Sequence, residues 1–99
     1  MNSIQFTKEA LFDIEDIIYW YEDQRKGFSY DFELCLEVGI FEIQRIPLGY
    51  QKRYKNVMIK FINRFPYGIH YIIQENVIST IGVFHTSRSP KNWKNRKNL

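Results

Sequence analysis

The residues best suited to chemistry are cationic and imidazole side chains in the second half of the chain. They are Lys52, Arg53, Lys60, Arg64, His70, His85 and Arg88. Lysine and arginine bind phosphate groups through charge and through guanidinium hydrogen bonds. A histidine among them can act as a general acid or base while the cations stabilise the charge that develops when a phosphodiester is cleaved. The set therefore predicts either a surface that binds an anionic partner or a site that cleaves a phosphodiester.

Other kinds of site lack their usual spacing. His70 and His85 are fifteen positions apart, and neither has a second metal ligand at the short spacing that metal sites use. The chain has no glycine-rich phosphate loop and no nucleophile elbow. Cys35 stands between Leu34 and Leu36 with no histidine or cation within a helical turn, so we expect a buried structural thiol. We therefore expect neither a metal nor a cofactor.

The charge is divided unequally between the two halves of the chain. Residues 1–49 hold four Lys and Arg against ten Asp and Glu, whereas residues 50–99 hold ten Lys and Arg against the single Glu75. The net charge is therefore −6 in the first half and +9 in the second. A surface divided in this way should attract polyanions or acidic proteins to its basic side.

Length and composition predict one domain that covers residues 1–99. At 44% hydrophobic and 17% aromatic residues the chain can bury a core, although 99 residues leave no room for two. No stretch approaches the roughly 20 apolar residues that span a bilayer. The single cysteine and the absence of a signal-peptide pattern predict a cytoplasmic protein without a membrane partner.

The first half of the chain is predicted to form a short strand and two helices. Residues 3–6 alternate as a strand, Thr7 is a good N-cap, and the first helix runs to about residue 24. A polar turn ends in Gly27, Ser29 is expected to cap the second helix, and Pro47 ends it. The expected inward positions have helical spacing: Ala10, Ile14, Ile17 and Tyr21, then Phe32, Cys35, Leu36, Ile40 and Ile43.

The second half is predicted to form three strands after a basic connector over residues 51–56. Strands are expected from Val57, after the Phe65-Pro66-Tyr67 segment, and from Val77 to about His85, with a turn at Glu75-Asn76. The predicted fold is therefore α+β with the order β-α-α-β-β-β, a helical hairpin on one face of a mainly antiparallel sheet. Lys60 is in register with Met58 and Ile62, so it should leave the sheet on the face opposite Ile59 and Phe61.

Motifs along nearly the whole chain resemble those of the RelE/ParE superfamily of bacterial type II toxin–antitoxin toxins, also called plasmid-stabilisation proteins. The most specific is Phe65-Pro66-Tyr67 followed by the ending His85, Arg88, Pro90 and Trp93. The other matching residues are Ala10, Asp13-Ile14, Tyr21, Gly27, Phe32, Ile43, Pro47, Arg53-Tyr54-Lys55-Asn56-Val57 and Arg64.

The resemblance implies a small cytoplasmic toxin that a cognate antitoxin holds inactive in a toxin–antitoxin hetero-oligomer. In this family some members cut mRNA at the ribosome without a metal, whereas ParE-type members poison DNA gyrase. Met58 stands at a strand position where relatives usually have Arg, and no Tyr follows Tyr71. Both departures favour the ParE-like growth inhibitor.

The resemblance also implies which residues would act in each case. For a RelE-like endoribonuclease, His85 would be the general acid or base, with Arg88 and Lys60 as phosphate and transition-state contacts. Binding of the target or of nucleic acid is assigned to Lys52, Arg53, Arg64 and Trp93, although Trp93 is expected to fold back on the domain rather than to stack on a base. A third alternative, motivated by Met58, is a degenerate relative that binds the antitoxin without being toxic.

Overall fold

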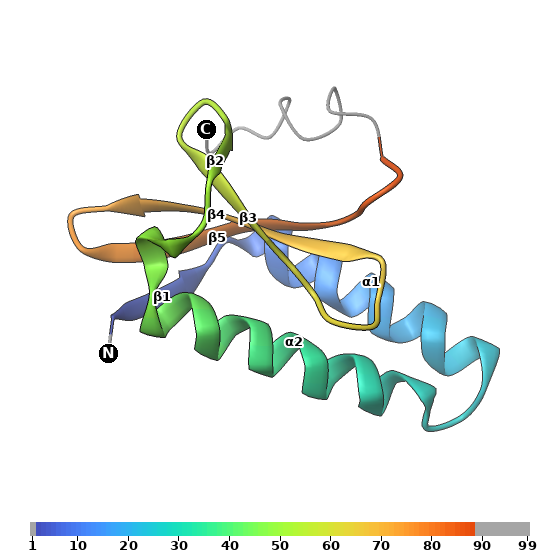
Figure 1. Ribbon diagram of the computed structural model, residues 1–99. Coiled ribbons are helices and arrows are strands. Elements are labelled where there is room, and N and C mark those ends of the chain that lie inside the picture. Colours follow the sequence, from blue (N-terminus) through green and yellow to red (C-terminus); the bar gives the residue numbers. More distant parts are fainter. Residues whose placement is uncertain (1, 89–99) are drawn as a thin grey trace.

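The computed structural model describes residues 2–88 and confirms the predicted α+β architecture (Figure 1). Its elements follow in the order β1 (Ser3–Phe6), α1 (Lys8–Gln24), α2 (Phe28–Arg45), the 3-10 turn η1 (Pro47–Gly49), β2 (Lys52–Tyr54), β3 (Val57–Phe61), β4 (Tyr67–Gln74) and β5 (Val77–His85). The two helices lie on one face of the sheet, as the sequence predicted (Figure 1). The predicted site residue Trp93 and the motif residue Pro90 lie outside the described residues.

The sheet has the strand order β1-β5-β4-β3-β2. β1 pairs in parallel with β5, and the other neighbouring strands are antiparallel. The turn predicted between β4 and β5 is confirmed, because Glu75 and Asn76 both adopt positive φ angles of 50° and 67°. Two left-handed residues in a two-residue turn match the right-handed twist of the paired strands.

β2 is the element that the sequence did not predict. It lies inside the stretch that we expected to be a basic connector and spans three residues. Its pairing with β3 changes register between Lys52 and Tyr54. A strand this short and irregular leaves no period-two pattern to detect, so only its partner β3 makes it a strand.

The start of α1 follows the prediction. The Thr7 hydroxyl accepts a hydrogen bond from the Ala10 N–H at 3.1 Å, which satisfies one of the free donors at the helix start. Ala10, Ile17 and Tyr21 are buried, and Ile14 packs against the same core. The stripe read from the spacing is therefore the face that α1 turns to the sheet.

The start of α2 differs from the prediction that Ser29 caps it. The N-cap is Gly27, whose φ of 85° lies in the left-handed region that favours glycine. Ser29 lies inside the helix and is buried, and its hydroxyl donates to Glu22 Oε2 at 3.2 Å. The Gly27 N–H also donates to the Glu22 carboxylate. Glu22 of the preceding helix thus fixes the Gly27 turn and the Ser29 side chain, and no side chain caps the first turn of α2.

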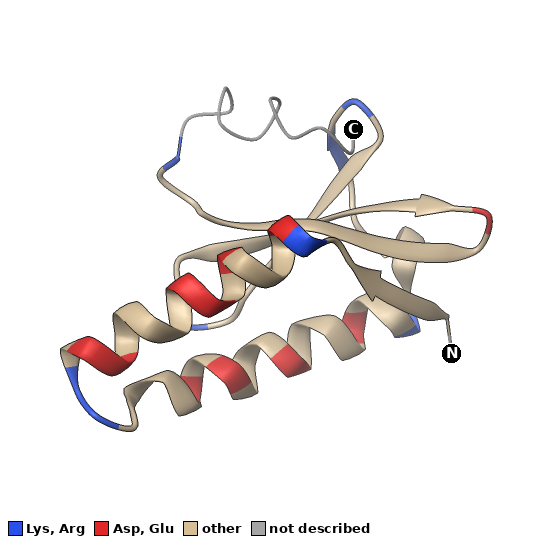
Figure 2. Ribbon diagram, turned by 180° about the vertical axis from the view of Figure 1, so that it is seen from behind, with Lys and Arg blue, Asp and Glu red and all other residues tan. Residues whose placement is uncertain are grey.

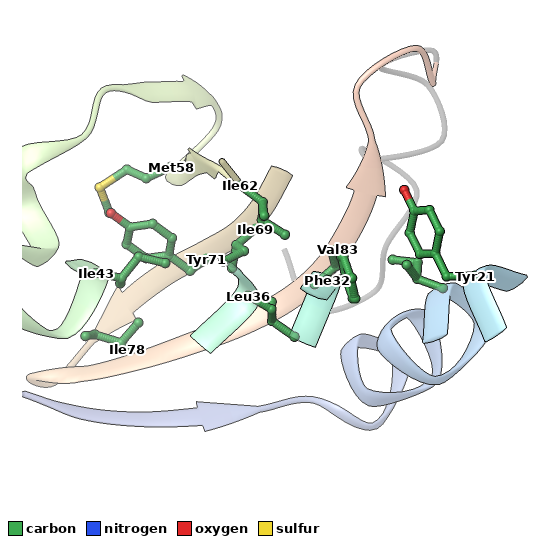
Figure 3. Packing of buried hydrophobic residues seen from close by; sticks show 11 residues of the cluster. Tyr21, Phe32, Leu36, Ile43, Met58, Ile62, Ile69, Tyr71, Ile78 and Val83 are labelled. Carbon is green, nitrogen blue, oxygen red and sulfur yellow. The ribbon is translucent and has the colours of Figure 1, made fainter. Parts of the chain in front are cut away.

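The main core lies between the helices and the sheet (Figure 3). Met58 is 2% exposed and packs in this cluster near Tyr71 and Ile43. Tyr71 is fully buried, and its hydroxyl donates to the Pro47 carbonyl at 2.8 Å, which joins β4 to the end of α2. A second, smaller cluster lies on the other face of the sheet and consists of Tyr54, Val57, Ile59, Ile72 and Ile81.

Gly68 lies on this second face, close to the side chains of β3. A Cβ atom added at Gly68 would lie 2.7 Å from Ile59 Cγ2 and 3.5 Å from Phe61 Cδ1. We expect Gly68→Ala to lower the free energy of unfolding by about 1–3 kcal/mol, because the buried Ile59 must move to admit the methyl group. Urea denaturation followed by circular dichroism measures the change.

Gly27→Ala separates this packing effect from a backbone effect. Nothing lies within 4 Å of a Cβ at Gly27, but its φ of 85° strains any side chain placed there. A Gly68→Ala variant as stable as the unaltered chain would contradict the packing argument.

Candidate functional site

A cleft of about 250 Å³ opens where the end of β5 passes α1. It brings together His85 and Arg88, which the sequence singled out, with carboxylates and aromatic rings that it did not. The lining residues are Asp13, Asp16, Ile17, Trp20, Tyr67, Val83, Phe84, His85 and Arg88. The cleft therefore mixes acidic, cationic and aromatic groups.

Asp13 holds α1 against this end of β5. β1 pairs with β5 only from Val77 to Thr80, so among residues 2–88 the β5 edge beyond Thr80 has no strand partner on that side. The Val83 N–H on this edge donates to Asp13 Oδ2 at 3.0 Å. The carboxylate thus takes the place of a neighbouring strand and fixes the position of one wall of the cleft.

His85 is held in a tight turn after β5. Its Nδ1 accepts a hydrogen bond from the Ser87 N–H at 3.0 Å and lies 2.7 Å from Ser87 Oγ. The Arg88 N–H donates to the His85 carbonyl at 3.0 Å, which places Arg88 in the same turn. Since a backbone N–H occupies Nδ1, the neutral ring has its proton on Nε2. The neutral imidazole can therefore donate a hydrogen bond from Nε2, whereas its basic nitrogen is used by Ser87.

The two phenols beside the cleft remain protonated at neutral pH. Burial raises the pKa of Tyr21 to about 12, and the adjacent Tyr67 adds to this shift. Burial also raises the pKa of Tyr67, although its hydrogen bond with Tyr21 and the Arg88 charge act in the opposite direction. The Tyr67 ring meets the His85 ring edge-on, with 5.2 Å between their centres. Tyr67 can thus donate a proton in a hydrogen bond but is a poor base.

Lys60 lies away from His85 and Arg88. It projects on the same side of the sheet as the buried Ile69 and Val83, which is the side covered by the helices. Its Nζ lies 3.2 Å from the Glu42 carboxylate of α2 and 5.1 Å from the centre of the Tyr50 ring. Lys60 therefore projects from the face of the sheet that strand alternation predicted. It contacts α2, whereas His85 lies in the cleft beside α1.

The other predicted cations lie around the β2–β3 hairpin and the turn before β4. Lys52 and Arg53 are exposed on β2, and Lys55 is exposed in the turn that follows. The Arg53 guanidinium lies 5.6 Å from the centre of the Phe61 ring. Arg64 is exposed between β3 and β4 and has a positive φ of 70°. In Figure 1 the tip of the β2–β3 hairpin lies on the opposite side of the sheet from the helices.

A larger cavity of about 610 Å³ lies beside the same hairpin. Its lining combines polar side chains, two of them lysines, with apolar residues of β3 and β4. The lining residues are Leu48, Lys52, Lys55, Asn56, Val57, Met58, Ile72, Ile73 and Gln74.

Sequence reasoning missed four side chains that shape the cleft beside β5: Asp13, Asp16, Trp20 and Tyr67. Asp13 and Tyr67 belong to motifs that it quoted for the fold but did not assign to a site. Asp16 and Trp20 lie outside the inward stripe predicted for the first helix. They line the same cleft as His85 because α1 packs beside the end of β5.

Metal-binding clusters and membrane-spanning helices are both lacking within residues 2–88. No group of three or more His, Cys, Asp and Glu side chains there is arranged to hold a metal ion. Neither α1 nor α2 is long and apolar enough to cross a membrane.

The fold is shared with a solved toxin–antitoxin structure. The match is a chain of the structure titled "Chromosomal ParDE TA system from P. aeruginosa", with a TM-score of 0.78 and 14% sequence identity. The alignment covers 88% of this chain and 98% of that one. No family model and no curated protein matches the sequence. At this identity the similarity establishes the fold.

The hydrogen bond between Val83 and Asp13 gives a prediction about the wall of the cleft. Asp13→Ala should lower the free energy of unfolding by about 1–3 kcal/mol, because the Val83 N–H loses its acceptor. Asp13→Asn keeps an acceptor oxygen and should lose clearly less. Urea denaturation of the two variants measures the difference, and equal losses would show that the hydrogen bond does not anchor α1.

The raised pKa of Tyr21 gives a prediction about alkaline stability. The unfolded chain loses this proton near the ordinary pKa of 10.0, whereas the folded protein keeps it up to about pH 12. The unfolded state is therefore increasingly favoured across that interval, and the free energy of unfolding should fall. Tyr21→Phe should show a smaller fall between pH 10 and pH 12 in urea denaturation.

The matched control for Tyr21→Phe is Tyr30→Phe, which alters a phenol that is 64% exposed on α2. Its stability should follow the same pH dependence as the unaltered chain. An identical fall in Tyr21→Phe and in the control would refute the assignment to Tyr21.

Proposed function

We propose that this protein is the toxin component of a type II toxin–antitoxin system. In this proposal it inhibits growth in the manner of ParE, by binding DNA gyrase, and a cognate antitoxin neutralises it in a hetero-oligomer in the cytoplasm. The fold shared with a chain of a ParDE system supports the class of protein. The family motifs in the sequence, which extend from Ala10 to Trp93, support the same class.

The arrangement of the cations is the observation that favours target binding over RNA cleavage. A nuclease of the kind considered above needs His85, Arg88 and Lys60 around one phosphate. Lys60 is instead paired with Glu42 against α2, and the other two lie beside α1. Catalysis requires reacting groups held within hydrogen-bonding distance of one substrate atom, so dispersed cations suit a binding surface better.

The environment of Met58 supports the same choice. Family resemblance led us to expect a functional cation at this position in active nucleases, and here the side chain is 2% exposed within the core. An arginine placed there would need a buried charge partner. Met58 therefore acts as a packing residue, and the sheet lacks one of the charges that the nuclease would use.

The proposed target-binding residues are Lys52, Arg53 and Lys55 on the β2–β3 hairpin, with Arg64 in the turn at the other end of β3. All four are exposed. Arg53 lies over the Phe61 ring, which is itself 47% exposed, so the surface offers an apolar contact as well as charge. Arginine and aromatic side chains together are typical of protein interfaces. Trp93, also assigned to target binding, lies outside the described residues.

A RelE-like endoribonuclease is the second candidate, and the cleft beside β5 favours it. His85 offers an N–H at Nε2, and Arg88 and the Tyr67 hydroxyl are in the same cleft. A donor and a cation there can bind a phosphate and protonate a leaving oxygen. In this case the chemistry would depend on His85 and Arg88, with Lys60 outside the cleft.

Tightly induced expression in a bacterial host distinguishes these candidates. Growth, genome-wide mRNA 5′ ends and plasmid supercoiling are followed together, and the purified chain is then added to purified gyrase. The gyrase proposal expects growth arrest, no cuts phased to codons and loss of supercoiling activity. Codon-phased cuts would establish the nuclease instead, and a folded chain that causes no arrest would indicate a relative without toxicity.

The charge reversal Lys52→Glu with Arg53→Glu tests the proposed binding surface. It should weaken gyrase binding roughly tenfold or more and relieve growth arrest, because two exposed cations become anions at the interface. Arg25→Glu with Lys26→Glu makes the same change in net charge on the loop between the helices and should retain toxicity. His85→Ala with Arg88→Ala should also retain it.

The gyrase proposal fails if both charge reversals weaken inhibition equally, since net charge alone would then explain the effect. It also fails if only His85→Ala with Arg88→Ala abolishes arrest. That result would identify the cleft beside β5 as the active site.

A further inference from the structure

The outer side of α2 presents an apolar stripe to solvent. Tyr30, Leu34, Val38 and Phe41 are 64%, 44%, 53% and 50% exposed. Their spacing of four, four and three residues aligns them along one side of the helix. The buried residues of α2, such as Phe32 and Ile43, occupy the opposite side and face the sheet. The helix thus has two apolar faces, and the core accounts for only one of them.

Carboxylates flank the stripe on both sides. Helical spacing places Asp31 and Glu42 on the side of α2 near β3, where Glu42 reaches Lys60, and places Glu33 and Glu37 on the side near α1. Arg45 at the end is the only Lys or Arg of α2. Figure 2 shows acidic residues along both helices, with most of the basic residues in the loops and on the β2–β3 hairpin.

The acidic and apolar pattern continues on α1. Leu11 and Tyr19 are 50% and 78% exposed. A shallow depression beside Tyr19 is lined by Glu15, Asp16, Ile18, Tyr19 and Glu22. Several half-exposed apolar residues beside one another are more than the single exposed residues of an ordinary surface, so the helical layer has the features of an interaction site.

We propose that the outer face of α2 is a docking surface for an amphipathic helix of a protein partner that has Lys and Arg beside its apolar residues. The apolar residues of the partner helix cover Tyr30, Leu34, Val38 and Phe41. Its cations lie against Asp31, Glu33 and Glu37, since Glu42 already pairs with Lys60. The surface is separate from the basic β2–β3 hairpin, so a partner bound here leaves that hairpin free. The inference goes beyond growth inhibition and does not depend on it.

Charge excludes the two other occupants that an apolar helix face commonly has. In a symmetric antiparallel dimer through α2, Glu33 of one copy would lie near Glu37 of the other, and like charges at a contact are destabilising. An anionic lipid surface would likewise repel the four carboxylates. A cationic helix satisfies both the apolar stripe and its acidic borders.

Two designed peptides test the proposal. Each has about 18 residues, slightly more than the shortest length at which an isolated helix is stable. Both have the same leucine stripe, flanked by lysines in one and by glutamates in the other. Each is titrated into the ¹⁵N-labelled full chain, and affinity is measured by calorimetry. The lysine peptide should bind, shift the amide signals of α2 and weaken with added salt. The affinity of the glutamate peptide should be lower by a factor of roughly ten or more.

Variants of the exposed positions assign the contact to α2. Leu34→Gln with Val38→Gln should weaken the lysine peptide roughly tenfold. Both positions are half exposed and glutamine favours helices, so the fold should persist. Glu33→Lys with Glu37→Lys should shift the preference toward the glutamate peptide. The control Leu48→Gln alters a side chain that is 77% exposed in η1 and should change nothing.

Three results would overturn the proposal. The first is equal binding of the two peptides or no binding of the lysine peptide. The second is unchanged binding in Leu34→Gln with Val38→Gln. The third is a concentration-dependent dimer in sedimentation that this variant abolishes, because a second copy would then be the occupant.

Discussion

The packing of the helical hairpin against β3, β4 and β5 is the interaction on which the rest of the structure depends. Phe32, Ile43, Ile69 and Tyr71 are fully buried between the two layers. This interface holds the larger of the two buried clusters, and in a chain of 99 residues burial of apolar side chains is the main source of stability. The positions of the helices on the sheet, and therefore of every surface residue, follow from it.

This packing also separates the charges of the protein. All ten acids of residues 1–49 are on the two helices, because each helix has only one side that faces the core. The described cations of the second half lie mainly in the hairpin and the turns of the sheet. An acidic helical layer and a basic hairpin are thus two surfaces of opposite sign, each suited to a different partner.

The candidate sites show where reading residues along the chain reaches its limit. His85 and Arg88 were grouped correctly because they belong to one turn, three residues apart. Lys60 was grouped with them because it is also a cation on a strand. It projects on the predicted face, but that face is covered by the helices, and α2 supplies Glu42 as its partner. The charge of a residue and the face of the strand on which it lies follow from the local sequence. The distance between Lys60 and the turn of His85, and the presence of α2 beside Lys60, do not.

The sequence by itself determined the elements, their order and the inward stripes of α1 and α2, because hydrophobic periodicity and the Thr7 cap act within a few residues. Tertiary structure alone decided that β2 is a strand, that the Ser29 hydroxyl bonds to Glu22 instead of capping α2, and that Asp13 accepts from the edge of β5. Each of these depends on a partner distant in sequence or on another element. Backbone donors and acceptors take whichever partner the packed fold brings near, and local propensity does not encode that choice.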